Sequence, residues 1–311
     1  MLLRAVFPLL CALVVCHAQG QDADASIARG DSLLSNGQPQ RALANYNDAV
    51  KARPDARSYT ARARAHYALD QLDSYLLDVE YALRMDSTIA ETHYQRAIYG
   101  LRAQDAGRAV RHCNSALAHG ASGQLREKVL VCRGEAFKDL GHDTEALEDL
   151  EEALGDHPTD PDAMSTMAEL LDKNGRHEEA LALLVKLCEL RPAEVGHWTS
   201  RGYELSLLGR HAEAIKIYDK ALSLDKDEPV ALSDRAYSLM MLGREEEALR
   251  DVDRSLRFYP SNAFALRTRG ILLVHKGDHE KACRDLNFAR LLGGVPDIDR
   301  LYQEHCANFK R

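Results

Sequence analysis

The sequence is short of aromatic residues and of positive charge, and each shortage excludes a class of protein. Aromatic residues make up 6% of the 311 residues, with a single tryptophan, Trp198. Such a content fits many small helix pairs better than one large core. Lysine and arginine number 40 against 48 acidic residues, which gives a formal net charge of -8. Because phosphate binding needs clustered Lys and Arg, this balance argues against a nucleic-acid partner.

Apolar runs are scarce beyond the start of the chain, so no integral membrane span is expected. Arg4 supplies a positive end, residues 5–15 form an apolar run, and small residues follow at Ala18 and Gly20. This order is typical of a secretory signal peptide, and the run is too short for a permanent anchor. The sequence therefore predicts a signal peptide over residues 1–20 and a secreted or periplasmic protein, or an ER-lumen protein in a eukaryote.

Cys16 leaves a second interpretation of the same segment open. A bacterial lipoprotein signal also ends at a cysteine, which would place the protein at the outer membrane through a lipid anchor. The bulky Val15 stands where that signal usually has a small residue. Lipidation at Cys16 is therefore the minor alternative to simple export.

A 34-residue period organises the rest of the chain. Each of five copies has a glycine, an alanine five residues later, and a bulky residue four residues after the alanine. The glycines are Gly141, Gly175, Gly209, Gly243 and Gly277. The alanines are Ala146, Ala180, Ala214, Ala248 and Ala282, and the bulky residues are Leu150, Leu184, Tyr218, Val252 and Leu286. A fixed period of this length marks stacked supersecondary units. The spacing within each unit predicts two amphipathic helices joined by a tight turn at the glycine.

Three further units lie upstream with more drift. The second has Asp70 where the turn glycine stands elsewhere, and the turn of the third falls near Gln104 and Asp105. Counting the units gives an array over residues 21–294 with repeats at about 23–56, 57–89, 90–123, 127–160, 161–194, 195–228, 229–262 and 263–294. Residues 295–311 are predicted to form a capping helix that begins at Asp297 and covers the last pair with Ile298, Leu301 and Tyr302.

These units resemble the tetratricopeptide repeat, a helix–turn–helix with the pattern W-x2-L-G-x2-Y…A-x3-F…P. The unit at residues 195–228 carries the pattern at Trp198, Gly202, Ala214, Tyr218 and Ala221, with Arg201 in place of the leucine. The closing proline is present at Pro54, Pro158, Pro192 and Pro260. The resemblance implies an all-α right-handed superhelix of about eight repeats. It identifies a fold well and a function poorly, since such arrays do many jobs.

Catalytic and cofactor motifs are missing. His177-Glu178 and His279-Glu280 match the start of a zinc-protease motif, but neither has the second histidine four positions after the first. No nucleophile elbow, glycine-rich phosphate loop or Cys/His pair of the nucleophilic kind appears. The sequence therefore predicts no enzyme, no cofactor and no metal site.

Five cysteines remain after the predicted signal peptide. Cys283 lies on the last second helix and Cys306 on the predicted capping helix, so a disulfide between them would hold the end of the array, contributing about 3 kcal/mol. Two free thiols, or a metal site with His279 and His305, are the alternatives. Cys113 and Cys188 are expected in the core, and Cys132 could pair with Cys113.

The resemblance also implies that first helices line a concave groove. Their projected residues form an apolar strip suited to a peptide strand or an amphipathic helix: Tyr203, Leu207, Tyr237, Met240, Met241, Phe264, Ile271 and Val274. A competing interpretation buries several of them between the units. A second candidate patch, basic and aromatic, comprises Arg57, Arg64, Tyr67 and Tyr94.

The function expected from these features is a scaffold that holds protein or peptide segments in its groove in the periplasm or a secretory compartment. Two alternatives use the same fold. A co-chaperone-like holdase would bind unfolded clients on the apolar strip, and a structural subunit of an envelope or secretion assembly would use the convex side.

Overall fold

The computed structural model describes residues 22–156 and 160–307, and every regular element in these ranges is a helix. This confirms the predicted all-α repeat fold. No helix in the described ranges has the length and apolar character needed to cross a membrane. The predicted signal peptide and Cys16 lie outside the described residues. The chain divides into two compact units, with the boundary in the sequence between Pro158 and Thr159.

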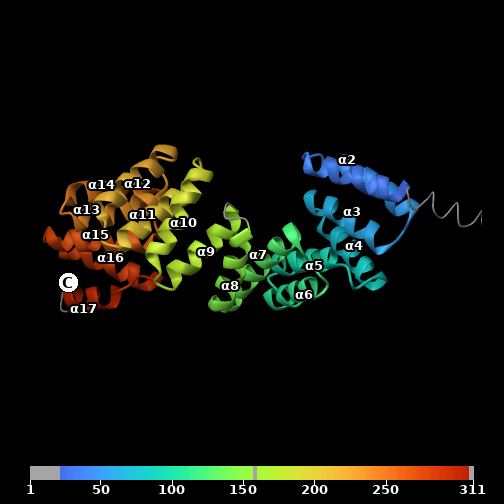
Figure 1. The fold of residues 1–311 in the computed structure, drawn as a ribbon. Coiled ribbons are helices and arrows are strands. Elements are labelled where there is room, and N and C mark those ends of the chain that lie inside the picture. Colours follow the sequence, from blue (N-terminus) through green and yellow to red (C-terminus); the bar gives the residue numbers. More distant parts are fainter. Residues whose placement is uncertain (1–21, 157–159, 308–311) are drawn as a thin grey trace, which may run out of the picture. The chain divides into compact units, whose positions relative to one another are not determined.

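Both units are built from consecutive helix pairs (Figure 1). In the N-terminal unit, a helical stretch at residues 22–35 precedes α2 (Pro39–Ala52), α3 (Ala56–Ala68), α4 (Leu72–Met85), α5 (Ala90–Arg102), α6 (Ala106–Ala118), α7 (Gly123–Leu140) and α8 (Asp143–Asp156). The C-terminal unit comprises α9 (Pro161–Lys173), α10 (His177–Leu190), α11 (Val195–Leu207), α12 (His211–Leu224), α13 (Pro229–Met241), α14 (Glu245–Phe258), α15 (Ala263–His275), α16 (His279–Leu292) and α17 (Ile298–Cys306).

The turns inside the pairs share one backbone conformation. Gly209 and Gly243 have φ values of 73° and 74°, in the left-handed region that favours glycine. Where the sequence lacks the glycine, the same conformation is kept, since Asp70 and Gln104 both have a φ of 56°. The irregular upstream units therefore retain the turn and carry a local conformational cost.

A second glycine position lets the two helices of a pair approach closely. A Cβ atom on Gly202 of α11 would lie 2.5 Å from the ring of Tyr218 on α12. Gly30 and Tyr46 repeat this relationship in the first pair, also at 2.5 Å. Both tyrosines are fully buried. The aromatic ring of the second helix thus fills the space that the glycine leaves on the first.

An ion pair recurs between the helices of four pairs. In each, an arginine on the first helix donates two hydrogen bonds to an aspartate sixteen residues later on the second: Arg62–Asp78, Arg133–Asp149, Arg235–Asp251 and Arg269–Asp285. Arg235 and Arg269 also reach the preceding second helix, at Asp219 and Asp253. These bidentate contacts fix the register between helices through the arginine fork.

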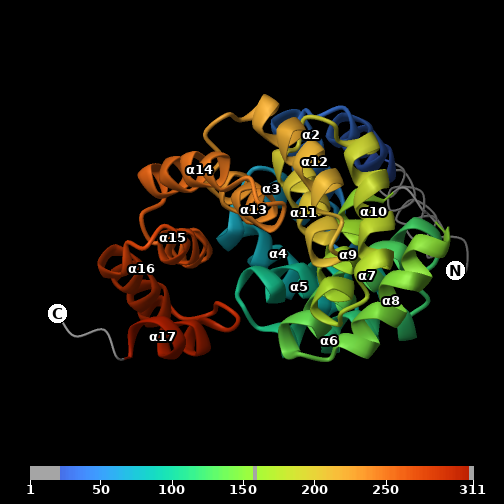
Figure 2. The ribbon, with the colours of Figure 1, turned by 90° about the vertical axis from the view of Figure 1, so that its left-hand side faces the viewer.

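Helix α17 closes the C-terminal unit by packing on α16 (Figure 2). Ile298 and Leu301 enter one hydrophobic cluster with Leu272 and Leu286. Cys306 is bonded to Cys283 of α16, with an S–S distance of 2.06 Å. The predicted cap by Asp297 is wrong in detail: this residue has a φ of 58°, and its side chain makes no capping hydrogen bond. Its carboxylate lies 3.5 Å from Arg300 instead.

Candidate functional site

The first helices of the C-terminal unit contact one another directly, α11 with α13 and α13 with α15. Helices that meet in this way form the inner face of a stacked array. A cavity of about 370 Å³ opens on this face. It is lined by Tyr203, Ser206, Leu207, Gly209, His211, Tyr218, Ser233, Asp234, Tyr237, Phe264, Arg267, Thr268, Pro296 and Asp297.

Half of the predicted apolar strip lines this cavity. Its four members are Tyr203, Leu207, Tyr237 and Phe264. Met240 and Ile271 pack against the hydrophobic cluster instead, as the competing interpretation has it. Met241 is 52% exposed and Val274 is half-buried, and neither lines the cavity. The structure therefore replaces a long apolar strip with a smaller, partly polar site.

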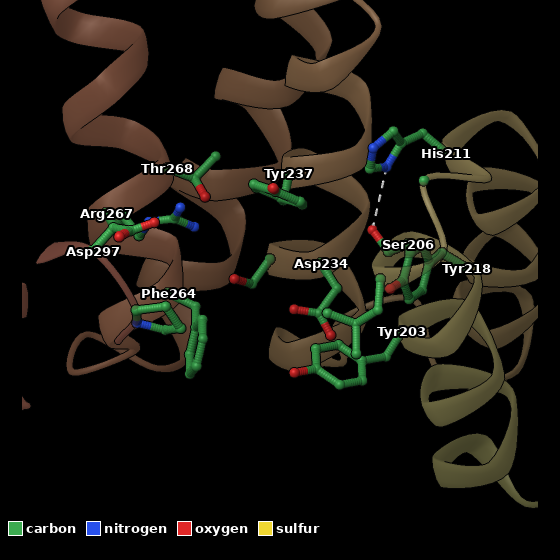
Figure 3. A pocket seen from close by; sticks show the side chains of 14 residues that line it. Tyr203, Ser206, His211, Tyr218, Asp234, Tyr237, Phe264, Arg267, Thr268 and Asp297 are labelled. Atoms are coloured by element: carbon green, nitrogen blue, oxygen red, sulfur yellow. Dashed lines mark hydrogen bonds between the residues drawn. The ribbon is translucent and has the colours of Figure 1, made fainter. Parts of the chain in front are cut away.

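Arg267 and the aromatic residues form the walls of the cavity. Figure 3 places Tyr203 and Asp234 on one side and Phe264 and Arg267 on the other. The guanidinium carbon of Arg267 lies 5.5 Å from the centre of the Tyr237 ring, within the range of a cation–π contact. The ring of His211 also contacts Tyr237, with the centres of the two rings 5.9 Å apart. Burial lowers the pKa of His211.

Two buried hydroxyl groups on the cavity wall have no hydrogen-bond partner among the described residues. They belong to Tyr218, whose side chain is 0% exposed, and Ser233, which is 2% exposed. The hydroxyl of nearby Ser206 bonds Ser238 at 2.8 Å and His211 at 3.4 Å. A buried hydroxyl without a partner costs about 1 to 3 kcal/mol, and the Tyr218 hydroxyl also lies near Ser206, which affects its ionisation.

Asp234 is the acidic group of the site. Among the described residues its carboxylate has no hydrogen bond and no cation. Burial raises the pKa of Asp234 to about 7, and the nearby carboxylate of Glu228 adds to the shift. The charge of Asp234 in turn contributes to the raised pKa values of Tyr203 and Tyr218, whose main cause is burial. The carboxyl group therefore lies close to both phenols.

Tyr203 also lines a second cavity of about 360 Å³ towards α9. Four carboxylates border it: Glu169, Asp172, Glu194 and Glu204. Asp172 and Glu204 lie 3.4 Å and 3.0 Å from Nδ1 of His177. Burial, followed by the charge of Asp172, raises the pKa of Glu204 to about 7. These three residues could hold a cation, since their ligand atoms lie within 4.8 Å of one another, but in the structure they pair among themselves.

The second candidate patch is divided between separate contacts. Its members are Arg57, Arg64, Tyr67 and Tyr94. Arg57 and Arg64 form ion pairs of 3.1 Å and 2.7 Å with Asp24 and Asp31. Tyr67 is 37% exposed beneath Arg102, whereas Tyr94 packs against the core. The arginines therefore hold the N-terminal helix in place, and the structure does not unite the four residues in one surface.

The N-terminal unit contains a histidine cluster that the sequence analysis missed. Nδ1 of His93 lies 3.1 Å from Nδ1 of His112, and the ring of His93 stacks on His119 with centres 5.4 Å apart. Burial, with the charges of His93 and Arg96, lowers the pKa of His112 to about 4. The remaining cysteines are inert core residues. Cys113, Cys132 and Cys188 are buried free thiols, and the contact with Cys113 together with burial raises the pKa of Cys132.

Sequence reasoning also missed Asp234, Tyr218, Ser233 and Arg267 as cavity residues. A signal for Asp234 is present in the register. The equivalent positions one period away on either side hold Ser200 and Thr268, so an acid stands where small neutral residues recur. In the sequence, however, Asp234 next to Arg235 looks like one more member of the many surface ion pairs of the chain.

Comparisons with known proteins agree on the family. Three models described as tetratricopeptide repeat match residues 27–74, 143–194 and 198–228. No curated protein matches the chain.

Among solved structures, a tetratricopeptide repeat protein from Parabacteroides merdae is 17% identical, with 91% of this chain and 98% of that chain covered and a TM-score of 0.51. YrrB, described as a TPR protein with an unusual peptide-binding site, is 21% identical with a TM-score of 0.52, covering 60% of this chain and 95% of that one. Residues 41 to the end of MamA from Desulfovibrio magneticus are 18% identical, at 56% and 96% coverage and a TM-score of 0.51. At these identities the structures support the fold alone. The three repeat matches, together with the helix pairs, show that the chain is a tetratricopeptide repeat protein.

Proposed function

We propose that the protein is a non-catalytic scaffold that binds a peptide or protein segment on the inner face of its C-terminal unit. The observation that carries the proposal is the cavity between α11, α13 and α15, where exposed aromatic surface and the carboxylate of Asp234, unpaired among the described residues, meet. Phe264, for example, is 43% exposed at its rim. Apolar walls with a few convergent polar groups are typical of ligand sites, and about 370 Å³ suits one side chain with its adjoining backbone.

The rigid scaffold supports this role. Arg235 and Arg269 each join the two helices of their own pair and also reach the preceding pair, at Asp219 and Asp253, so the inner face is preorganised. A preorganised surface loses little conformational entropy when a segment binds. The peptide-binding site named for YrrB is consistent with segment binding by a similar fold, although it does not identify the partner.

A selective scaffold is favoured over a holdase for unfolded clients. A holdase needs a broad apolar surface, but Met240 and Ile271 are packed into the core. The remaining surface is small and is interrupted by Asp234 and Arg267. Such a site discriminates between segments through its polar groups.

The test is binding of fluorescein-labelled peptide pools to the full chain, measured by anisotropy. The pools are acetylated, amidated pentapeptides with one fixed central residue. Replacing Tyr237 and Phe264 by alanine should weaken the best pool by about tenfold or more, because both rings line the cavity. Phe258→Ala, at an exposed phenylalanine on α14, serves as the control and should bind like the parent. If no pool binds the parent chain, the proposal is wrong.

We further propose that the scaffold acts after export. The signal-peptide pattern of residues 1–20 motivates this, and the Cys283–Cys306 disulfide supports it, since such bonds persist in oxidising compartments. N-terminal sequencing of the protein from its source should show a start near residue 21. A chain that keeps Met1 would contradict export by this signal, and a lipid-modified N-terminal Cys16 would favour the anchored alternative.

A further inference from the structure

We propose that the cavity selects a lysine or arginine side chain of the bound segment, with Asp234 as its counter-charge. The inference rests on the proposed function and adds the chemistry of the residue that is recognised. It is carried by two observations on the cavity wall: a carboxylate without a cation among the described residues, and aromatic rings at the rim.

The electrostatic environment favours a cationic occupant. Asp234 and Asp297 both line the cavity, while Glu228 lies close enough to Asp234 to affect its ionisation. The neighbouring cavity adds four carboxylates along the same face. A cation that enters this region can pair with Asp234, to which the described residues supply no ion-pair partner.

Arg267 does not reverse this preference. Its guanidinium already lies over the Tyr237 ring, on the opposite side of the cavity from Asp234 (Figure 3). The buried Nε of Arg267 has no acceptor among the described residues. This atom is closed off from the cavity, so it does not attract an anion into the site.

The remaining groups match a long basic side chain. Lysine and arginine carry an apolar stem that can lie along the rings of Tyr203 and Phe264, and a head with several donors. The Asp234 carboxylate offers the charged acceptor for that head. A neutral side chain of the same length would leave the carboxylate unpaired.

The test compares pools whose central residue is Lys, Arg, Gln, Met or Glu, with the full chain and anisotropy as the readout. The Lys and Arg pools should bind about tenfold or more tightly than the Gln pool, which is the loss expected when a charged hydrogen-bond partner is missing. Asp234→Asn should remove this preference while leaving binding of the Gln and Met pools within about twofold. Glu246→Gln changes an exposed acid on α14 and is the matched control.

Each outcome has one meaning. Equal binding of all pools, or a basic preference that survives Asp234→Asn, overturns the inference but leaves the proposed scaffold intact. Tightest binding of the Glu pool, lost in Arg267→Gln, would show that an anion is selected and would also overturn it. Failure of every pool to bind overturns both proposals. Circular dichroism of each variant verifies that the fold is retained.

Discussion

Arg235 donates two hydrogen bonds, of 2.7 Å and 2.8 Å, to Asp251, whereas the adjacent Asp234 faces the cavity with no cation among the described residues. Asp234 and Arg235, adjacent on α13, therefore have different roles. Arg235 joins the helices of one pair as its equivalents do elsewhere in the array. Asp234 contributes nothing of this kind to the scaffold, and its burial without a cation carries a cost in stability.

Asp234→Asn should stabilise the protein at neutral and higher pH. The folded pKa of about 7 lies above the ordinary value of 3.8. The contribution of the protonated Asp234 to the free energy of unfolding is therefore fully present below about pH 4 and is lost as the pH rises through 7. The variant removes this loss. Its free energy of unfolding should exceed that of the parent by about 2 kcal/mol at pH 8 and equal it at pH 4. Urea denaturation at both pH values measures the difference; equal stabilities at pH 8 would contradict the burial argument.

His112 should make the N-terminal unit sensitive to acid. Its pKa of about 4 lies below the ordinary 6.5, so the unfolded chain takes up a proton before the folded chain does as the pH falls from 6.5 to 4. His112→Gln should therefore reduce the stability lost between pH 7 and 5 by about 1 to 2 kcal/mol. Urea denaturation at the two pH values measures this. The same substitution at His142, whose side chain is 52% exposed, should leave the loss unchanged.

Gly202→Ala should destabilise the C-terminal unit by about 2 kcal/mol, because the added Cβ overlaps the buried ring of Tyr218. Gly196→Ala on the same helix is the contrast. No atom lies within 4 Å of the Cβ position there, so alanine should stabilise α11 by up to about 1 kcal/mol. Thermal unfolding followed by circular dichroism separates the two. Equal effects at both positions would mean that the close approach of α11 and α12 is not what Gly202 provides.

The turn glycines, the helix pairs and the capping helix were predictable because local spacing determines them. A period of 34 residues with glycine and alanine in register places Gly209 in a turn and Ala214 in the packing face without any knowledge of neighbours. Even the irregular turn at Asp70 could be placed from the register, and its left-handed backbone confirms that the repeat continues through it.

The cavity was only partly predictable, since it depends on side chains from three helices and the loop before α17. Tyr203 and Phe264 could be projected onto the inner face from the repeat. Whether Met240 pointed into the groove or the core depended on packing between units, which a single-unit pattern does not determine. Asp297 reaches the cavity through an unpredicted left-handed backbone.

Removing the disulfide should loosen α17 first. Cys306→Ser opens a link between residues 23 apart in sequence, a loop for which about 3 kcal/mol is expected. Hydrogen exchange should accelerate in α17 and the adjoining end of α16, while α9 and α10 keep their rates. Treatment of the parent chain with a reductant should reproduce the change. Unchanged exchange in α17 would mean that its apolar contacts alone hold it.

The most direct test of the account is hydrogen exchange of the full chain with and without the tightest-binding peptide pool. Segment binding on the inner face predicts protection concentrated in α11, α13 and α15, the helices that line the cavity. Asp234→Asn should diminish that protection for the Lys pool and not for the Met pool. Protection confined to the second helices α12, α14 and α16, or to the N-terminal unit, would contradict the account.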